Sequence, residues 1–202
     1  MSVLTRTEIW QALADGQTGK GLVISPLVGG SKQIGPSSVD LHVAHEFIIF
    51  SRAKVEAFDV VEWSREKKNV YMYQAKERIS RGQKFVLHPH QLVLGASIEY
   101  ISLPCNISGD IKGRSTWGRT GLIIATATKV DPGFQGCVTL ELVNAGEVPL
   151  VLYPGLCVAQ IVLMWTKKPG HYGGRYRYPT GPGFPELADE IKSLPSFYKP
   201  TE

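Results

Sequence analysis

Cysteine is scarce in this sequence, and its few cysteines are far apart. Cys105, Cys137 and Cys157 are the only three among 202 residues, and no Cys-x-x-Cys pair occurs. An odd number of distant cysteines argues against the disulfide framework of small secreted domains, so we expect a reducing compartment, the cytoplasm. Cys137 and Cys157 lie in apolar, strand-like runs, where we expect core thiols rather than nucleophiles.

Long apolar runs and a strong charge bias are missing too. No apolar run approaches the ~18 residues of a membrane-spanning helix, and the first residues lack the pattern of a signal peptide. The net charge of +4 suits a small polyanionic ligand better than a nucleic acid, which requires a clustered basic stripe. We therefore expect neither a membrane nor a nucleic acid as partner.

The rest of the composition is typical of a folded globular protein. Hydrophobic residues make up 43% and charged residues 20% of the chain. Its length fits one domain of ~100–200 residues. Short runs rich in β-branched and apolar residues alternate with glycine and proline turns, and their number predicts a mainly β fold, a barrel or jelly roll. These runs are residues 21–26, 38–43, 85–87, 91–94, 100–103, 122–130, 137–143, 150–153 and 158–165.

Short helices are expected at both ends of the chain. Thr5 and Glu8 have the spacing of a capping box, which predicts a helix over residues 5–16. Leucine and isoleucine recur at helical spacing within residues 185–194, which predicts a short C-terminal helix. The charged, irregular run at 54–70 is expected to be a solvated excursion.

The clearest functional pattern lies between residues 112 and 141. Arg114, Ser115 and Arg119 fall within six residues, with glycines among them. Arginine offers a planar fork of donors that suits phosphate or carboxylate, and glycine lets a backbone approach a ligand closely. These residue types suit an anionic ligand.

A strand with an acidic residue follows this segment after a turn signal. Within residues 137–141, Thr139 and Glu141 share one face of the strand, and Val138 and Leu140 share the other. For an isolated glutamate, a solvated position on a sheet surface is the favoured interpretation. The whole set of motifs around Glu141 makes it a candidate site residue instead.

Several motifs follow one another in order along the chain. Gly-Arg-Ser-x-x-Gly-Arg, Val-Asp-Pro-Gly-Phe-x-Gly and Leu-Glu occur within residues 112–141. Further segments of the same pattern are Pro36-Ser37-Ser38-Val39-Asp40-Leu41, Phe85-Val86-Leu87-His88-Pro89, Val148-Pro149-Leu150 and Tyr153-Pro154-Gly155. Together these motifs resemble the dCTP deaminase branch of the trimeric dUTPase superfamily, over roughly residues 21–165.

This resemblance implies both a fold and an activity. The fold is a single dUTPase-like domain over residues 1–202, a β-barrel or jelly roll in which residues 170–202 form a flexible C-terminal flap and helix. The activity is hydrolytic deamination of dCTP to dUTP and ammonia, in pyrimidine deoxynucleotide metabolism. The assembly is a homotrimer with shared active sites, in which the Gly-Arg-Ser segment comes from a neighbouring subunit.

Deamination of a cytosine ring needs an activated water and a proton path to the leaving ammonia. Zinc deaminases carry His-x-Glu and Pro-Cys-x-x-Cys, whereas Cys105 follows Pro104 here without a second cysteine beside it. A site without a protein-bound metal must rely on a carboxylate, and Glu141 is the candidate general base. By resemblance, Ser115 and Arg119 orient the water and keep Glu141 ionised. A structural ion pair between Arg119 and Glu141 is the alternative interpretation.

The resemblance also implies a set of nucleotide contacts, with dCTP or dUTP as ligand. Mg²⁺ would bridge phosphate oxygens of the triphosphate. Backbone groups of strand residues 139–141 would read the base, and Asp131 would face the deoxyribose or activate a water in members that also hydrolyse dUTP. The predicted nucleotide-binding residues are Arg114, Ser115, Thr116, Arg119, Asp131, Thr139, Leu140, Tyr172, Arg175 and Tyr176.

The sequence departs from the family pattern in two places. The span from Arg119 to Asp131 is one residue shorter and lacks the histidines that deaminases of this family tend to carry. In the tail, Tyr172 and Arg175 are closer together than usual, and Pro179 stands where a glutamine is expected. The sequence therefore leaves several functions open. They are dCTP deamination alone, deamination joined to dUTP hydrolysis, dUTP hydrolysis only, and dNTP binding without turnover.

Overall fold

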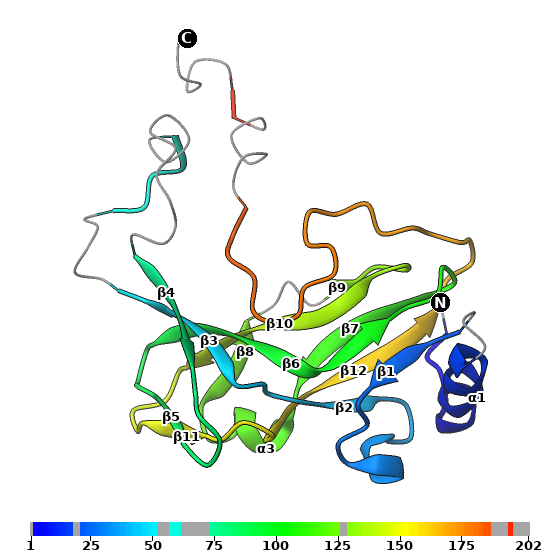
Figure 1. Cartoon of the computed structure of the whole chain (residues 1–202), viewed down its shortest axis with the longest axis horizontal. Coiled ribbons are helices and arrows are strands. Elements are labelled where there is room, and N and C mark those ends of the chain that lie inside the picture. Colours follow the sequence, from blue (N-terminus) through cyan, green and yellow to red (C-terminus); the bar gives the residue numbers. More distant parts are fainter. Residues whose placement is uncertain are drawn as a thin grey trace.

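The fold is taken from a computed structural model that describes residues 2–17, 21–51, 57–61, 73–125, 129–186 and 194–195. Its strands form a six-stranded sheet in the order β4-β3-β6-β10-β8, with β1 also paired to β6, and a four-stranded sheet in the order β2-β12-β7-β9. A third, two-stranded sheet joins β11 to β5 (Figure 1). The predicted mainly β fold is therefore confirmed, and no helix of the described residues is both long and apolar enough to span a bilayer.

The strands alternate with only short helical segments. The strands are β1 (Val23–Ser25), β2 (Val39–His42), β3 (Glu46–Phe50), β4 (Gln74–Arg78), β5 (Phe85–Leu87), β6 (Leu92–Ser102), β7 (Ile107–Gly113), β8 (Leu122–Ala125), β9 (Lys129–Val130), β10 (Gln135–Asn144), β11 (Leu150–Leu152) and β12 (Cys157–Trp165). The helical segments are α1 (Arg6–Gln17), the 3-10 turn η1 (Gly30–Gln33) and the single turn α3 (Ser115–Gly118).

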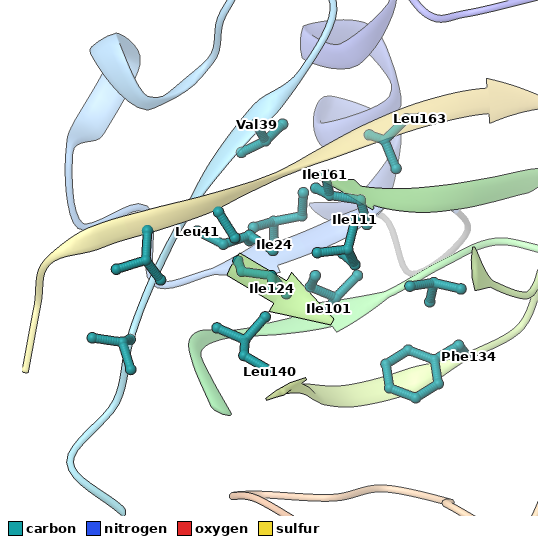
Figure 2. Packing of buried hydrophobic residues seen from close by; sticks show 14 of the residues in the cluster. Ile24, Val39, Leu41, Ile101, Ile111, Ile124, Phe134, Leu140, Ile161 and Leu163 are labelled. Carbon is teal, nitrogen blue, oxygen red and sulfur yellow. The ribbon is translucent and has the colours of Figure 1, made fainter. Parts of the chain in front are cut away.

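The hydrophobic core lies between the two larger sheets. Leu140 of β10 and Ile101 of β6 point toward Ile161 and Leu163 of β12, as Figure 2 shows. All four side chains are fully buried. Burial of apolar side chains on the inner faces of facing sheets stabilises such a fold by about 25 cal/mol per Å² removed from water. Side chains on the outer face of the six-stranded sheet therefore lie outside this core.

Helix α1 begins as the capping box predicts. The backbone N–H of Thr5 donates to Glu8 Oε2 over 2.8 Å, and the N–H of Glu8 donates to Thr5 Oγ1 over 3.4 Å. The hydrogen bonds from Thr5, its backbone N–H first, lower the pKa of Glu8. The helix buries Ile9 and Ala12 and packs against β1.

The sequence pattern did not predict strands β3, β4 and β7, which depend on the strands that they pair with. Strands β3 and β4 form an edge hairpin whose β4 is mostly charged, and β7 contains two glycines. In β7, a Cβ atom at Gly109 would lie 2.5 Å from Ile161 Cδ1 of the neighbouring β12, so glycine is needed for close packing there. The predicted run 122–130 divides into β8 and β9. Of the C-terminal helix predicted over 185–194, residues 187–193 lie outside the described residues, and residues 185, 186 and 194 are not helical.

Candidate active site

A cavity of about 520 Å³ opens on the outer face of the six-stranded sheet. Its floor comes from β6 and β10, and its walls come from the β3–β4 hairpin, the turn before β10 and the tail after β12. The lining residues are Phe50, Phe58, Tyr73, Gln74, Leu92, Leu94, Ala125, Lys129, Val130, Asp131, Phe134, Cys137, Val138, Thr139, Glu141, Val143, Tyr172, Tyr176, Pro179, Gly183 and Pro185.

Glu141 is placed in this cavity by the alternation of β10. Its neighbours along the strand, Leu140 and Leu142, are fully buried in the core, so the carboxylate faces outward as predicted. Its cross-strand neighbours are Leu94 of β6 and Ala125 of β8, both apolar. Among the described residues no ion pair joins Glu141 to a cation, so the alternative of a pair with Arg119 inside one chain is not observed.

The alternation fails at Val138. The pairing of β10 with β6 shifts register between Cys137 and Thr139, and the N–H of Val138 turns to Ser97 Oγ over 2.9 Å. This β-bulge rotates Val138 into the cavity beside Thr139 and Glu141, whereas the sequence pattern placed it on the opposite face. Leu140 keeps its core-facing position, so any ligand contact from it is confined to its backbone.

The turn before β10 carries Asp131 and brings the tail close. Lys129 Nζ lies 2.8 Å from Asp131 Oδ1, and this hydrogen bond raises the pKa of Lys129. Gly133 and Gly136 have φ angles of +81° and +150°. A Cβ at Gly136 would lie 2.3 Å from Pro179 Cδ. Glycine here therefore serves both the backbone conformation and the approach of the tail.

The tail after β12 passes beside β10 (Figure 1). Its residues line one side of the cavity. The N–H of Tyr178 donates to the carbonyl of Gln135 over 3.1 Å, and the N–H of Cys137 donates to the carbonyl of Pro179 over 2.7 Å. Tyr172 packs edge-on against Phe134 with ring centroids 5.5 Å apart.

Two of the three tail residues predicted to bind nucleotide line the cavity. They are Tyr172 and Tyr176. Arg175 is not part of the lining, and its guanidinium donates to the backbone carbonyl of Glu186.

The Gly-Arg-Ser segment lies apart from the cavity of its own chain. Arg114 Nη1 is 2.9 Å from Asp40 Oδ2 and 2.7 Å from Cys157 Sγ. Burial raises the pKa of the Cys157 thiol, which fits the core thiol expected from the sequence. Ser115, Thr116 and Arg119 are exposed, and none of them lines the cavity.

A buried carboxylate, Glu99, stabilises this region through hydrogen bonds. The sequence pattern did not identify it. Glu99 of β6 is fully buried. Its Oε1 accepts from Gln33 Nε2 over 2.9 Å and lies 2.6 Å from His42 Nδ1, and its Oε2 accepts from the backbone N–H of His42 over 2.9 Å. Gln33 Nε2 also donates to the carbonyl of Asp40 over 2.7 Å. Glu99 therefore fixes the strand that carries Asp40, the partner of Arg114. The sequence signal that could have identified Glu99 is a charged residue between Ile98 and Tyr100 in a mostly apolar strand.

We expect Glu99→Gln to lower the free energy of unfolding by about 1–3 kcal/mol. A carboxylate only accepts hydrogen bonds, whereas an amide places two N–H donors on one side. Either orientation of the glutamine amide would set a donor against Gln33 Nε2 or against the N–H of His42. Urea unfolding of both proteins measures the loss, and Glu77→Gln, an exposed change, is the control. Equal midpoints for wild type and Glu99→Gln would contradict the assigned acceptor role.

Comparisons with known proteins identify the family of the chain. A family model described as dCTP deaminase-like matches residues 3–166. The dCTP deaminase of Halorubrum lacusprofundi is 34% identical over 203 residues, which are 97% of this chain and 94% of that protein. The dUMP-forming dCTP deaminase of Dictyoglomus turgidum is 39% identical over 168 residues, covering 80% of this chain and 84% of that protein.

A solved structure is similar in fold. The crystal structure of 2'-deoxycytidine 5'-triphosphate deaminase from Agrobacterium tumefaciens superposes with a TM-score of 0.57 at 20% sequence identity. The match covers 80% of this chain and 47% of that one, so this chain spans about half of its length. At this level of identity the similarity concerns the fold alone.

Proposed function

Because the chain belongs to the dCTP deaminase-like family, we propose that it catalyses the hydrolytic deamination of dCTP to dUTP and ammonia. The observation that carries the proposal is the position of Glu141. Its carboxylate stands in a cavity between apolar neighbours, with Thr139 and Asp131 lining the same cavity. A carboxylate in such surroundings is suited to move a proton between water and a leaving group.

The base would enter with its Watson–Crick edge toward β10. In this orientation the backbone around Thr139 and Glu141 faces the ring nitrogen and the amino group, and the deoxyribose lies toward Asp131. Phe134 and Tyr172, packed edge-on at the same end of the cavity, would enclose the sugar. The 4-amino group then lies beside the Glu141 carboxylate.

The reaction needs one water and two proton transfers. Glu141 takes a proton from water as the oxygen attacks C4 of the ring, which forms a tetrahedral centre. The same carboxylate delivers that proton to the amino nitrogen, the C4–N bond breaks, and ammonia leaves. The second proton of the water leaves the new hydroxyl and ends on N3 of the ring as the C4 carbonyl of uracil forms, so the atoms of dCTP and water are all found in dUTP and ammonia.

The exposed Gly-Arg-Ser segment supports a shared site. Arg114 is held by Asp40, and Ser115, Thr116 and Arg119 face outward, where a neighbouring subunit could reach them. We infer a homotrimer in which this segment meets the triphosphate and the Glu141 carboxylate of the next chain. An arginine fork suits the phosphate oxygens, and a cation beside Glu141 keeps it ionised.

We propose that Mg²⁺ arrives with the nucleotide, bound through its triphosphate. Within the described ranges, no three His, Cys, Asp or Glu side chains gather as ligands for a metal ion. Phosphate oxygens and water would then supply most of its ligands, as is usual for Mg²⁺. Bound in this way, the ion would neutralise triphosphate charge while the protein supplies the groups around the base.

The tail would act as a flap over the nucleotide. Tyr172 and Tyr176 already line the cavity, and Arg175 belongs to the same segment. A closing segment of this kind excludes water and completes the contacts to the ligand. We propose that residues from 170 onward have this role.

A dUMP-forming activity is the second candidate. Asp131 lines the same cavity as Glu141, so one site could also direct a water to the phosphate chain. The relative from Dictyoglomus turgidum bears the name of a dUMP-forming enzyme.

Incubating the pure protein separately with dCTP and dUTP plus Mg²⁺ separates these functions. We expect ammonia and dUTP from dCTP, measured by an ammonia assay and chromatography. The appearance of dUMP from both nucleotides would identify the joined activity, and dUMP from dUTP alone would replace deamination by dUTP hydrolysis. Binding of both nucleotides with no product would contradict an enzymatic role.

A further inference from the structure

A buried amide in the cavity wall lacks a partner. Gln74 of β4 is 2% exposed and lines the cavity, yet its Oε1 accepts no hydrogen bond from the part of the chain that the structure describes. Its Nε2 makes one long contact of 3.4 Å to the hydroxyl of Tyr73. Leaving a buried acceptor unpaired costs about 1–3 kcal/mol, and such groups often await a ligand. A donor on the ligand would complete the site.

The surroundings of this amide are aromatic. The ring centroid of Tyr73 is 6.0 Å from that of Phe50 and 5.8 Å from that of Phe58. All three rings line the cavity with Gln74. Burial raises the pKa of Tyr73. The wall therefore presents one unpaired acceptor on an apolar surface, which suits a small apolar group that carries one hydrogen-bond donor.

Sheet register places this wall on the cavity face of the same sheet as Glu141, two residues further along the strands. Glu141 pairs with Leu94, and Leu94 pairs with Ile48 of β3. Phe50, two residues after Ile48, pairs with Gln74. Neighbouring strands are about 4.8 Å apart, so β4 lies three strand spacings away from β10 across the cavity.

A base whose Watson–Crick edge faces β10 turns its C5–C6 edge toward β3 and β4. Since C5 is bonded to C4, a substituent at C5 extends toward this wall while the 4-amino group stays at Glu141. The orientation of the base follows from the proposed deaminase function, and the present inference rests on it.

We propose that Gln74, Phe50, Phe58 and Tyr73 form a subsite for a C5 substituent of the cytosine that carries an O–H or N–H donor. The hydroxymethyl group is the smallest member of this class in which a carbon separates an O–H donor from the ring. Its methylene contacts the rings, and its hydroxyl donates to Gln74 Oε1. Plain cytosine has only hydrogen at C5, and a methyl group fills space without pairing the amide. The preferred substrate is accordingly a C5-hydroxymethylated or similarly substituted dCTP, deaminated by the same addition of water and loss of ammonia.

The test compares kcat/KM for dCTP, 5-methyl-dCTP and 5-hydroxymethyl-dCTP. One net hydrogen bond corresponds to about a two- to tenfold advantage, so wild type should favour 5-hydroxymethyl-dCTP over 5-methyl-dCTP by that factor. In Gln74→Leu this preference should disappear, with 5-methyl-dCTP turned over at least as well as by wild type. Gln83→Leu, the same change at an exposed position outside the cavity, should keep the wild-type preference.

A second measurement checks the unpaired amide itself. Because Gln74→Leu removes a buried acceptor that has no partner, its thermal midpoint should equal or exceed that of wild type. A marked fall in the midpoint would show that the amide is paired in the free protein and would overturn the inference. Equal kcat/KM for the two C5-substituted nucleotides in wild type, or a preference unchanged in Gln74→Leu, would overturn it as well.

Failure of the proposed function gives a different result. If none of the three nucleotides releases ammonia, deamination is wrong, and calorimetric dissociation constants for the same nucleotides then test the subsite. Tighter binding of 5-hydroxymethyl-dCTP that is lost in Gln74→Leu would support the subsite without deamination. Equal binding of all three, or no binding, would overturn it.

Discussion

Replacing Glu141 by glutamine should lower kcat for ammonia release from dCTP by about 10²–10⁴-fold, the usual contribution of a general base. Glutamine keeps the size and much of the hydrogen-bonding capacity of the side chain but cannot take a proton from water. The strand should be unaffected, because residue 141 pairs through its backbone with Leu94 and Ala125. Steady-state rates of ammonia release from both proteins measure the effect.

Binding separates catalysis from structure in this variant. The triphosphate contacts are assigned to arginines elsewhere, so the dissociation constant of dCTP for Glu141→Gln should stay close to that of wild type. Glu147→Gln, an exposed change in the turn just after β10, is the matched control and should alter neither quantity. Near-normal ammonia release by Glu141→Gln would refute the assigned base. Loss of binding together with turnover would make Glu141 a structural partner of the arginines.

Features set by neighbouring residues could be predicted from the sequence. Helix α1 follows from the capping pair Thr5 and Glu8, which are three residues apart and lie just before the buried Ile9. The outward position of Glu141 follows from the two-residue period of a strand. In both cases the determining contacts lie within a few residues of one another, so a local pattern carries the information.

Features set by pairing between distant segments could not be predicted. The bulge at Val138 depends on Ser97, and Gly109 depends on Ile161 of another strand. Gln74 reaches the cavity of Glu141 only because β3 and β6 lie between β4 and β10. No pattern within a short window encodes such register, so the sequence does not single out Gln74, and the run 54–70, which contains Phe58, is interpreted from it as a solvated excursion.

The partner of Arg114 illustrates the same limit. Asp40 lies 74 residues earlier in the chain, and its carboxylate meets the guanidinium because β2 and β7 both pair with β12. The motifs identified both residues, yet only the paired strands explain why Arg114 is held at the surface and away from its own cavity. The same placement raises the question of which chain supplies the cations to Glu141.

Two inactive variants should restore activity when they share a trimer. Arg119→Ala removes a cation from the exposed segment, and Glu141→Gln removes the base, so each homotrimer should be inactive. If a site takes Glu141 from one chain and Arg119 from the next, a mixed trimer contains one site in which both residues are intact. Co-expression with two different affinity tags and tandem purification isolates these mixed trimers, which should show about a third of wild-type activity.

The restored activity depends on the assembly, so light scattering accompanies the assay. A trimer mass is expected for the wild type, for both variants and for the mixed particle, and a monomer under assay conditions would refute the shared site. Mixed trimers as inactive as their parents would place Arg119 and Glu141 of one site on the same chain. That result would conflict with the position of Arg119, which is exposed and absent from the lining of its own cavity. Recovery of activity would instead assign the exposed segment to the neighbour's nucleotide, because no other arrangement returns both groups to one site.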